Sequence, residues 1–539
     1  MDMFGGLTKT SSRIAIASAL GMTLGGFAMG ASPAKAADLG GDCCADLEER
    51  VAELEATTVR KGNKKVSVTL SGWVVKYADF WDDGVESNVY VGDKHTTLSS
   101  HFQISGSATI APGWSSGYTI AVETRGNSTV GDANQFNDNT SAINAVGILE
   151  NINVLLSYMW IKSDRWGTIN WGQLSQATDN VALLPDLSGT IIESNAVLFD
   201  GQGFFLRPTG RGIPANAQGL SGLSWGNMVH CLEEGGGIGA DCNGFPQNGV
   251  RYDSPTWAGF SVSGGFAEDD VWDIALKYAA DWNSIKFSAA AGFSQNTDEG
   301  CIAGGNPGHA NRATCFTSAS ASGGAGAVVG GGGAPFQDFR ADRNVAQVGA
   351  SILHVPSGLW AYGLYQHEEN NGTDVSVIQN GLNSFNNRFG GDANDTDVWF
   401  VKAGIKRTWW PAGATVLWGE GGQYLDQFSS QAGVDLCAAG TRGGTTPNAQ
   451  TQFGGGGVCF NNESAFLTGS TVNRWGAGVM QEIDSAAMHL WFNWQHLELD
   501  ANFVANPLGT SNTNIHNFRN ANQGFDNLDM FMAGGVIFF

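Results

Sequence analysis

The sequence contains few charged residues and, after its first forty positions, no long apolar run. Charged residues make up 15% of the 539 positions, against about 25% in an ordinary soluble domain. No run of about 18 apolar residues follows position 40, which excludes a bundle of membrane-spanning helices. Bases are the scarcer charge, with 28 Lys and Arg against 51 Asp and Glu. The resulting net charge of −23 argues against nucleic acid as a partner.

Catalytic and metal-binding motifs are also missing. The nine histidines form no His-Glu-x-x-His group and the eight cysteines form no Cys-x-x-Cys group, so we expect no metal site. The glycine-rich tract 323–334 lacks the Lys-Ser/Thr pair of a phosphate-binding loop. Two Gly-x-Ser-x-Gly matches, 113–117 and 222–226, are expected by chance among 76 glycines. The segment 236–241 resembles one calcium-repeat unit, but a single copy cannot stack into a β-helix. We therefore expect neither an enzyme nor a cofactor.

The first 36 residues read as a secretory signal peptide. Lys9 and Arg13 give a short positive region, and the stretch 14–31 is apolar and rich in small residues. Small residues at Ala34 and Ala36 then mark a cleavage site, which places the mature start at Ala37. A membrane anchor is the alternative. An exported chain can oxidise its cysteines.

The segment 37–64 is expected to lie in the periplasm and to contain a short helix. Leu47, Val51, Leu54 and Thr58 follow the 4-3-4 spacing of a coiled coil, with glutamates between them. A helix of barely two heptads is marginal on its own. It is either a coiled coil with partner chains or a frayed, charged helix.

From residue 65 to 539 the residues alternate with a period of two. In 271–278, Trp272, Ile274 and Leu276 alternate with Asp273 and Lys277, which predicts a strand with one apolar and one wet face. Most such segments have the length of a tilted strand that crosses a bilayer. The sequence predicts sixteen strands, which begin near Val66, His101, Tyr118, Ile152, Thr168, Gly249, Phe260, Val271, Ser284, Asn344, Leu359, Asp397, Ala414, Asn473, Met488 and Leu528.

Short turns alternate with long links between these strands. The short turns are 111–117, 163–167, 255–259, 280–283, 355–358, 408–413 and 484–487, and the long links are 126–151, 174–248, 295–343, 368–396, 424–472 and 499–527, while 267–270 is a short link on the long side. No proline falls inside a predicted strand. Tryptophans recur at the short turns, at positions 114, 166, 257, 282, 409 and 410, as in an interfacial girdle. These features predict an all-β, transmembrane antiparallel β-barrel of sixteen strands over 65–539.

Three segments resemble general porins of the outer membrane. The terminal strand LDMFMAGGVIFF at 528–539 ends in Phe539, like the strand read by the barrel-assembly machinery. VRYDSPTWAGF at 250–260 resembles a porin strand–turn signature, and RWGTINWGQ at 165–173 resembles the strand that leads into the constriction loop. The start of the mature chain, CCADLEER at 43–50, is similar to alphaproteobacterial porins. The resemblance implies a water-filled homotrimeric channel in the outer membrane, in contact with lipid and lipopolysaccharide.

The resemblance also implies an eyelet formed by an inward-folded third loop, which the long link 174–248 matches. In such porins acidic loop residues face basic wall residues and create a transverse field. The loop candidates are Asp179, Asp186, Glu193 and Asp200; the wall candidates are Arg125, Arg251, Lys277, Lys286 and Lys402. Arg207 and Arg211 could instead line the eyelet from the loop. Alternatively, each of these charged residues is a solvated residue of the rim or of a loop. The acidic residues have a further alternative, which is to bind divalent cations that bridge outer-leaflet lipids.

The cysteines allow three pairs that each lie within one long link. These are Cys231 with Cys242, Cys301 with Cys315, and Cys437 with Cys459. Eight cysteines permit 105 connectivities, but the barrel topology favours these local pairs. Cys43 and Cys44 are adjacent and cannot easily pair with each other, so bonding between chains is a hypothesis for them.

The predicted function is passive diffusion of ions and small hydrophilic solutes. A substrate-selective channel on the same barrel and a non-transporting structural or adhesive barrel are the alternatives. The negative net charge hints at a preference for cations. Charge in the lumen, rather than net charge, decides ion selectivity.

Overall fold

The computed structural model describes fifteen segments of the chain. They are 66–94, 98–124, 133–135, 152–197, 200–209, 224–229, 231, 239–242, 246–268, 270–297, 342–371, 395–427, 464–506, 519–522 and 524–539. Outside them lie the expected signal peptide and coil, the wall candidate Arg125, the loop candidate Arg211, and Cys43, Cys44, Cys301, Cys315, Cys437 and Cys459.

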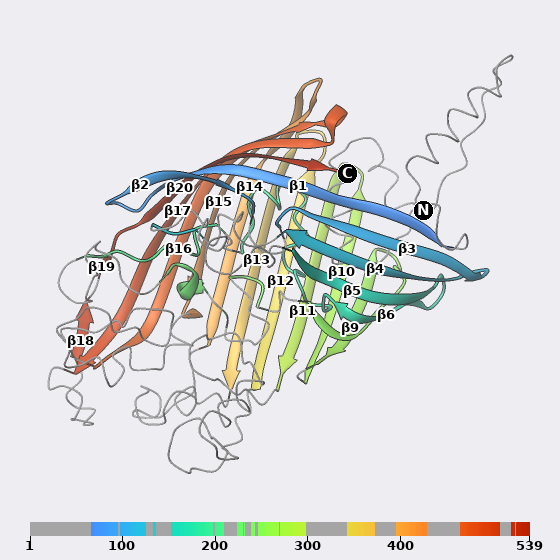
Figure 1. The fold of residues 1–539 in the computed structure, drawn as a ribbon, viewed down its shortest axis with the longest axis horizontal. Coiled ribbons are helices and arrows are strands. Elements are labelled where there is room, and N and C mark those ends of the chain that lie inside the picture. The colour runs from blue at the N-terminus through green and yellow to red at the C-terminus, as the bar shows by residue number, and fades with distance from the viewer. Residues whose placement is uncertain are drawn as a thin grey trace, which may run out of the picture.

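Sixteen antiparallel strands form a closed ring (Figure 1). They are β1 (Ser67–Asp82), β3 (His101–Ala111), β4 (Trp114–Thr124), β5 (Ile152–Ser163), β6 (Gly167–Leu174), β8 (Gln247–Asp253), β9 (Phe260–Ala267), β10 (Val271–Trp282), β11 (Ile285–Asn296), β12 (Asp342–His354), β13 (Leu359–Asn371), β14 (Thr396–Trp410), β15 (Gly413–Leu425), β16 (Ser464–Ile483), β17 (Met488–Asn506) and β20 (Leu528–Phe538). Each strand pairs with the next along the chain, and β20 returns to β1, with Trp73 opposite Phe538. The predicted sixteen-stranded barrel is confirmed. No helix among the described residues is long and apolar enough to cross a bilayer.

The second wall strand is interrupted, which the sequence did not predict. Strand β2 (Ser87–Gly92) pairs with the C-terminal half of β1, and β3 pairs with its N-terminal half. The described residues between them, 93–94 and 98–100, belong to neither strand. This interruption, called the excursion below, breaks the period-two pattern, so only the part that begins at His101 was recognisable from sequence. Smaller additions are β18 (Arg519–Asn522) on β17 and the two-stranded pair of β7 (Pro208–Thr209) with β19 (Gly524–Phe525).

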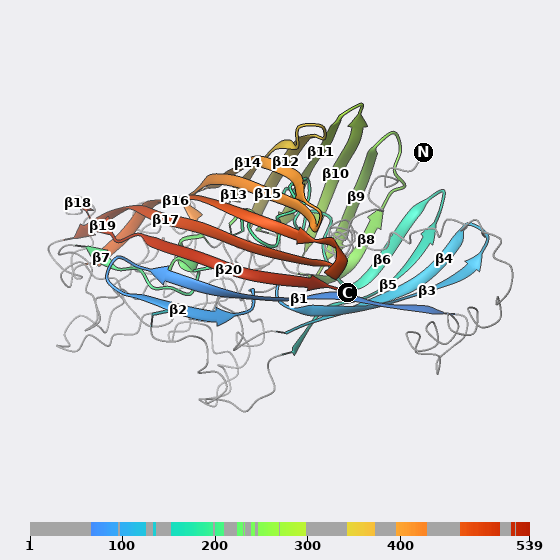
Figure 2. The same cartoon turned by 90° about the horizontal axis from the view of Figure 1, so that it is seen from above.

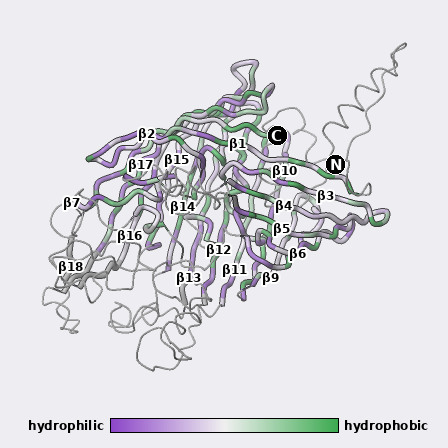
Figure 3. The backbone as a smooth tube through the Cα atoms, viewed as in Figure 1, coloured by the Kyte–Doolittle hydropathy of each residue, from purple (hydrophilic) through white to green (hydrophobic). Residues whose placement is uncertain are grey.

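Alternate residues of the wall point to opposite sides, as the sequence predicts. Figure 3 shows the hydropathy along the backbone, where hydrophilic and hydrophobic residues occur within the same strands. On β10 the outward Trp272 and Ile274 are 37% and 48% exposed, whereas the inward Asp273 and Ala275 are 4% and 1% exposed. The tryptophans of the short turns are also exposed; Trp257 reaches 80% and Trp410 67%. An apolar outer band that ends in aromatic side chains suits a bilayer and its interfaces.

The described parts of the chain between β6 and β8 lie inside the ring and pack against part of its wall (Figure 2). Leu183, Ile192 and Phe204 of this segment join inward side chains of the wall in one apolar cluster. Wall members include Trp73 of β1 and Trp360 of β13, which are 1% and 4% exposed. Burying a large apolar side chain stabilises by about 1.5–3 kcal/mol. The inward face of this sector therefore contacts protein rather than water, which alternation alone could not reveal.

Candidate functional site

The segment from Ser175 to Cys242, called the inner loop below, is shaped by side chains that bond their own backbone. Asn180 adopts a left-handed conformation with φ 56°, and its carbonyl accepts the N–H groups of Leu183 and Leu184. The carboxylate of Asp186 accepts the Ser188 N–H at 2.8 Å. Asn, Asp and Ser favour such turns because their short side chains can replace a backbone partner. These turns give residues 180–190 of the inner loop a defined local path.

A buried ion pair fixes the middle of the inner loop to β14. The Lys402 Nζ lies 3.0 Å from the Asp186 carboxylate and donates to the Ser194 carbonyl at 2.8 Å. Both charged side chains are at most 2% exposed. Lys402 points inward, as its position in the alternation predicts, and the Asp186 carboxylate compensates its charge.

A second group joins the loop to β15, β16 and β17. His489 Nδ1 lies 2.8 Å from the Glu193 carboxylate. Arg474 Nη2 donates to Glu420 at 2.8 Å and to the Ser194 hydroxyl at 3.0 Å, and that hydroxyl donates to Glu420 at 2.5 Å. The Arg474–Glu420 pair is buried. Loop and wall therefore share one connected polar network here.

A third group holds the loop against the start of the barrel. The Asp200 carboxylate accepts from Lys94 Nζ at 2.7 Å and from the Tyr77 hydroxyl at 2.6 Å. Further along the loop, Arg207 Nε donates to Asp83 at 2.6 Å. All these groups are nearly inaccessible to solvent. Arg207 thus binds the turn between β1 and β2 instead of standing free in the lumen.

The fourth acidic candidate, Asp179, lies beside a second carboxyl group of the loop, Asp241. Asn180 connects them, because its side chain donates to Asp179 at 2.5 Å and its backbone N–H donates to Asp241 at 3.0 Å. Burial, and next the charge of Asp241, raise the pKa of Asp179 well above its usual range. Burial raises the pKa of Asp241 to about 7, against a smaller lowering by the Asn180 N–H.

Strands β8 and β10 complete the surroundings of this carboxyl pair. Arg251 Nε lies 3.2 Å from Asp253, and its Nη1 donates to the Ser175 carbonyl at 2.5 Å. Asp273 accepts from the backbone N–H and the hydroxyl of Thr178, at 2.7 and 3.0 Å. The wall candidate Arg251 is therefore buried against the loop it was expected to face.

The remaining wall candidates, Lys277 and Lys286, point inward and are partly exposed. Within the described part of the chain neither forms an ion pair with a carboxylate. Lys286 stands opposite Asp281 in the register of β10 and β11. Their neighbours on the same face, Ser261 and Ser288, are also partly exposed. These residues, toward the short-turn ends of β9 to β11, thus form a partly accessible, polar inner surface, whereas Asp273, Ala275 and Ala290 farther along β10 and β11 are buried.

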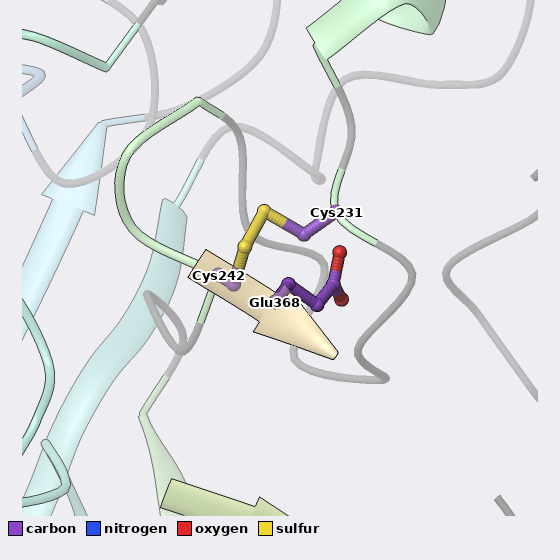
Figure 4. A group of neighbouring side chains, drawn as sticks. All are labelled: Cys231, Cys242 and Glu368. Carbon is purple, nitrogen blue, oxygen red and sulfur yellow. A yellow bond between two sulfur atoms is a disulfide. The ribbon is translucent and has the colours of Figure 1, made fainter. Parts of the chain in front are cut away.

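A disulfide closes the end of the inner loop. Cys231 and Cys242 are bonded, and both are buried (Figure 4). Gln366 of β13 and Gln427 after β15 donate to the Gly239 carbonyl within the closed turn, at 3.1 and 2.8 Å. This is one of the three local pairs expected from the sequence. The other two lie outside the described residues.

Several residues of the site were missed from sequence. Lys94, Glu420, Arg474 and His489 anchor the loop. The alternation places Arg474 and His489 on the inward side, so a charged residue at an inward position was an available signal. Lys94 had no such signal, because it lies in the excursion between β2 and β3.

A family model for Gram-negative porins matches residues 17–379 of the chain. The chain belongs to the Gram-negative porin family. As a porin it is a channel of the outer membrane for passive diffusion of ions and small hydrophilic solutes. A search among curated proteins finds no match.

Solved porin structures are similar to this porin over most of its length. The anion-selective porin from Comamonas acidovorans has 14% identity and a TM-score of 0.45, covering 88% of this chain and 100% of that chain. OprB of Pseudomonas putida has 11% identity and a TM-score of 0.44, covering 92% and 97%. Salmonella typhi OmpF in complex with daunomycin has 12% identity and a TM-score of 0.42, covering 89% and 99%.

Proposed function

We propose that solutes cross this porin past the partly exposed residues Ser261, Lys277, Lys286 and Ser288 of β9 to β11, beside an inner loop that packs on Ala275 and Ala290 of the same strands. The observation that carries this proposal is the contrast between two sectors of the lumen. Inward side chains of β13 to β17 are packed beneath the loop, whereas Ser261, Lys277 and Ser288 remain accessible. Passage through such a lumen is passive, and its width and charge decide what enters.

The ion preference proposed here is for anions. Asp186 and Asp200 are buried against the ammonium groups of Lys402 and Lys94, so their charge is largely compensated, and Glu193 is buried beside His489. Lys277 and Lys286 keep solvent access on the proposed path. This reverses the hint from net charge, because much of the acidic excess lies away from this surface.

Planar-bilayer recording tests both points. Purified porin should give ohmic channels, and the reversal potential under a KCl gradient should have the sign of a chloride preference. Lys277→Glu should shift the reversal potential toward cations. Arg165→Glu, at an exposed periplasmic turn, makes the same charge change outside the lumen and should leave it unchanged. Silence from folded protein would favour a plugged, structural barrel, and a cation-selective wild type would overturn the anion preference.

A substrate-selective channel is the second candidate, and it needs aromatic side chains that a solute can reach. The inward aromatics Trp73, Tyr77 and Trp491 are 1%, 2% and 4% exposed, because the loop and neighbouring strands cover them. Saturation of conductance by a sugar or another solute would nevertheless support this candidate. A linear dependence of flux on solute concentration supports general diffusion.

We also propose that the mature porin begins at Ala37 and assembles as a homotrimer. Lys76 supports an intersubunit contact, because its side chain lies on the outward face of β1, where it pairs with Asp93 at 2.7 Å and is still 51% exposed. Charged side chains on the lipid face are destabilising, most strongly at the bilayer midplane, and a neighbouring subunit would cover this ion pair. Native mass spectrometry in detergent should give three chains, each starting at Ala37; a single chain would contradict the trimer.

A further inference from the structure

The turn closed by the disulfide is seated on the inner wall. Cys231 and Cys242 are 2% and 0% exposed. The Cys242 backbone N–H donates to Gln366 of β13 at 3.3 Å, and the Gln427 amide holds the Gly239 carbonyl at 2.8 Å. Gln366 on the wall and Gln427 just after β15 therefore hold the 239–242 end of the turn through hydrogen bonds that do not involve the S–S bond.

A carboxylate completes a group of three metal-binding side chains. Glu368 of β13 is buried, and one of its carboxylate oxygens lies within 4.8 Å of both sulfur atoms. Figure 4 shows its side chain beside the disulfide. Thr396 donates to this carboxylate at 3.1 Å, which fixes its orientation. Two sulfur ligands and one carboxylate oxygen suit a divalent cation with affinity for thiolates.

Amide donors point at the sulfur atoms. The Gln366 Nε2 donates to Cys242 Sγ at 2.8 Å, and the Gln427 Nε2 donates to Cys231 Sγ at 3.6 Å. An N–H group that donates to sulfur stabilises the thiolate over the thiol, since it partly compensates the negative charge. Such outer contacts orient the ligands of metal sites. A disulfide that only tethers a loop does not require them.

We propose that Cys231, Cys242 and Glu368 bind Zn²⁺ once the disulfide has been reduced. The reductant is a small-molecule dithiol, which gives two electrons and two protons to the S–S bond and becomes a cyclic disulfide. The two Cys thiols then release two protons as they bind Zn²⁺, and Glu368 supplies the third ligand. In a tetrahedral site with Zn–S bonds of about 2.3 Å, the sulfur atoms stand roughly 3.8 Å apart.

The wall accommodates this change without releasing the loop. The Cα atoms of the two cysteines are 5.3 Å apart, and non-bonded sulfur atoms must separate in any case when the bond breaks. The metal then takes over the function of the covalent bond, because it joins the turn directly to Glu368 on β13. Reduction by a thiol alone would weaken the attachment of the turn to the wall, and Zn²⁺ binding to the reduced cysteines would preserve it.

The test uses a full-length variant in which the other six cysteines are serine, so that only this pair can react. The folded protein in detergent is reduced with dithiothreitol, freed of reductant without oxygen, and titrated with Zn²⁺ against a chromophoric chelator. We expect one Zn²⁺ per chain after reduction and none before it. Replacing Zn²⁺ by Cd²⁺ should give the ultraviolet band of Cd–thiolate bonds, which reports sulfur ligation directly.

Two further variants decide the ligand set. Cys231→Ser with Cys242→Ser should abolish binding, and Glu368→Gln should weaken it about tenfold or more, since even outer-contact changes cost about 10–100-fold. Heat-modifiable migration on electrophoresis verifies that each variant is folded. Equal Zn²⁺ binding with and without the cysteine pair would overturn the site, and unchanged affinity in Glu368→Gln would remove the third ligand.

Discussion

Single acidic side chains of the inner loop each have a defined partner, and these pairs set how the loop responds to its surroundings. Asp186 and Glu193 contact Lys402 and His489. A buried charge that loses its partner is strongly destabilising, whereas replacing both partners by apolar groups can be nearly neutral. The carboxyl pair of Asp179 and Asp241 differs, because two like charges lie together and their protonation depends on pH.

The Lys402–Asp186 contact should behave as a coupled pair. Lys402→Met alone should lower the free energy of unfolding by about 3–5 kcal/mol, because Asp186 is left buried and charged. Lys402→Met with Asp186→Leu should recover most of that loss. Urea unfolding in detergent measures the four free energies of the cycle. His367→Ala is the control: its pair with Asp397 is 38% and 35% exposed, so its loss should be below about 1 kcal/mol. Equal losses in single and double variants would contradict the coupling.

Stability should fall as pH rises from about 4 to about 7, because of Asp241. Its pKa in the folded chain is about 7, whereas the unfolded value is about 3.9. The folded chain therefore holds more protons over this range, and the stabilisation present at low pH is lost as Asp241 ionises. Asp241→Asn removes this ionisation and leaves an acceptor for the Asn180 N–H. The free energy of unfolding, measured at pH 4, 6 and 8, should increase for the variant relative to the original chain as the pH rises. A constant difference would rule out the explanation.

At the scale of elements, the contact between the inner loop and the wall depends on small residues in the strands. A Cβ atom on Gly349 of β12 would overlap the Ala182 carbonyl, and one on Gly292 of β11 would lie 2.8 Å from Thr178. The loop backbone at Ala182 and the loop side chain of Thr178 thus approach these strands more closely than a side chain on either glycine would permit. The glycines of the wall therefore help to position the loop, together with its ion pairs.

Gly349→Ala should displace the inner loop from β12. Overpacking of this kind costs about 1–3 kcal/mol, and amide hydrogen exchange near Ala182 should accelerate. Gly363→Ala is the matched control on β13, because its nearest neighbour would be Val401 at 3.6 Å, an ordinary contact. Unchanged exchange near Ala182, or equal acceleration in both variants, would show that the loop does not rest on Gly349.

The sequence predicts the strands of the barrel wall much better than the contacts of the inner loop inside the barrel. Alternation assigns Trp272 to the outside and Asp273 to the inside correctly, because a strand allows only two directions for a side chain. The same rule places Lys402 inward but cannot say that Asp186 meets it, since that contact joins distant segments. Strand β2 was missed because the excursion from Asp93 to Ser100 interrupts the pattern. The buried Tyr362 shows the limit most clearly, because an inward position in a porin suggests water, whereas its hydroxyl donates to the Ala182 carbonyl of the inner loop.

On the scale of the whole molecule, the barrel closes where the chain ends. Phe539 exchanges two backbone hydrogen bonds with Gly72, at 3.0 and 3.1 Å, while its side chain is 53% exposed. The side chain therefore contributes little packing to the closed barrel. Its resemblance to an assembly signal offers a separate reason for an aromatic residue here.

Phe539→Ser should reduce assembly in cells and leave refolding in detergent unchanged. The substitution keeps both backbone bonds to Gly72, so the closed barrel loses little. The folded, heat-modifiable fraction in outer-membrane preparations should fall several-fold. Ile537→Ser, which alters a side chain of similar exposure at 49%, should have a small effect. Equal losses from both substitutions would point to membrane packing instead of recognition.

The pairing of β1 with β20 also has a kinetic consequence. Every other neighbouring pair in the ring can form as a hairpin or across one loop, but Trp73 meets Phe538 only after nearly the entire chain lies between them. This pairing has the largest sequence separation of any strand pair in the ring, and long-range pairing of this kind slows folding. Until it forms, β1 and β20 present open edges that can pair with other chains. The seam, rather than any hairpin, is thus the step at which an unfinished barrel is most exposed to aggregation.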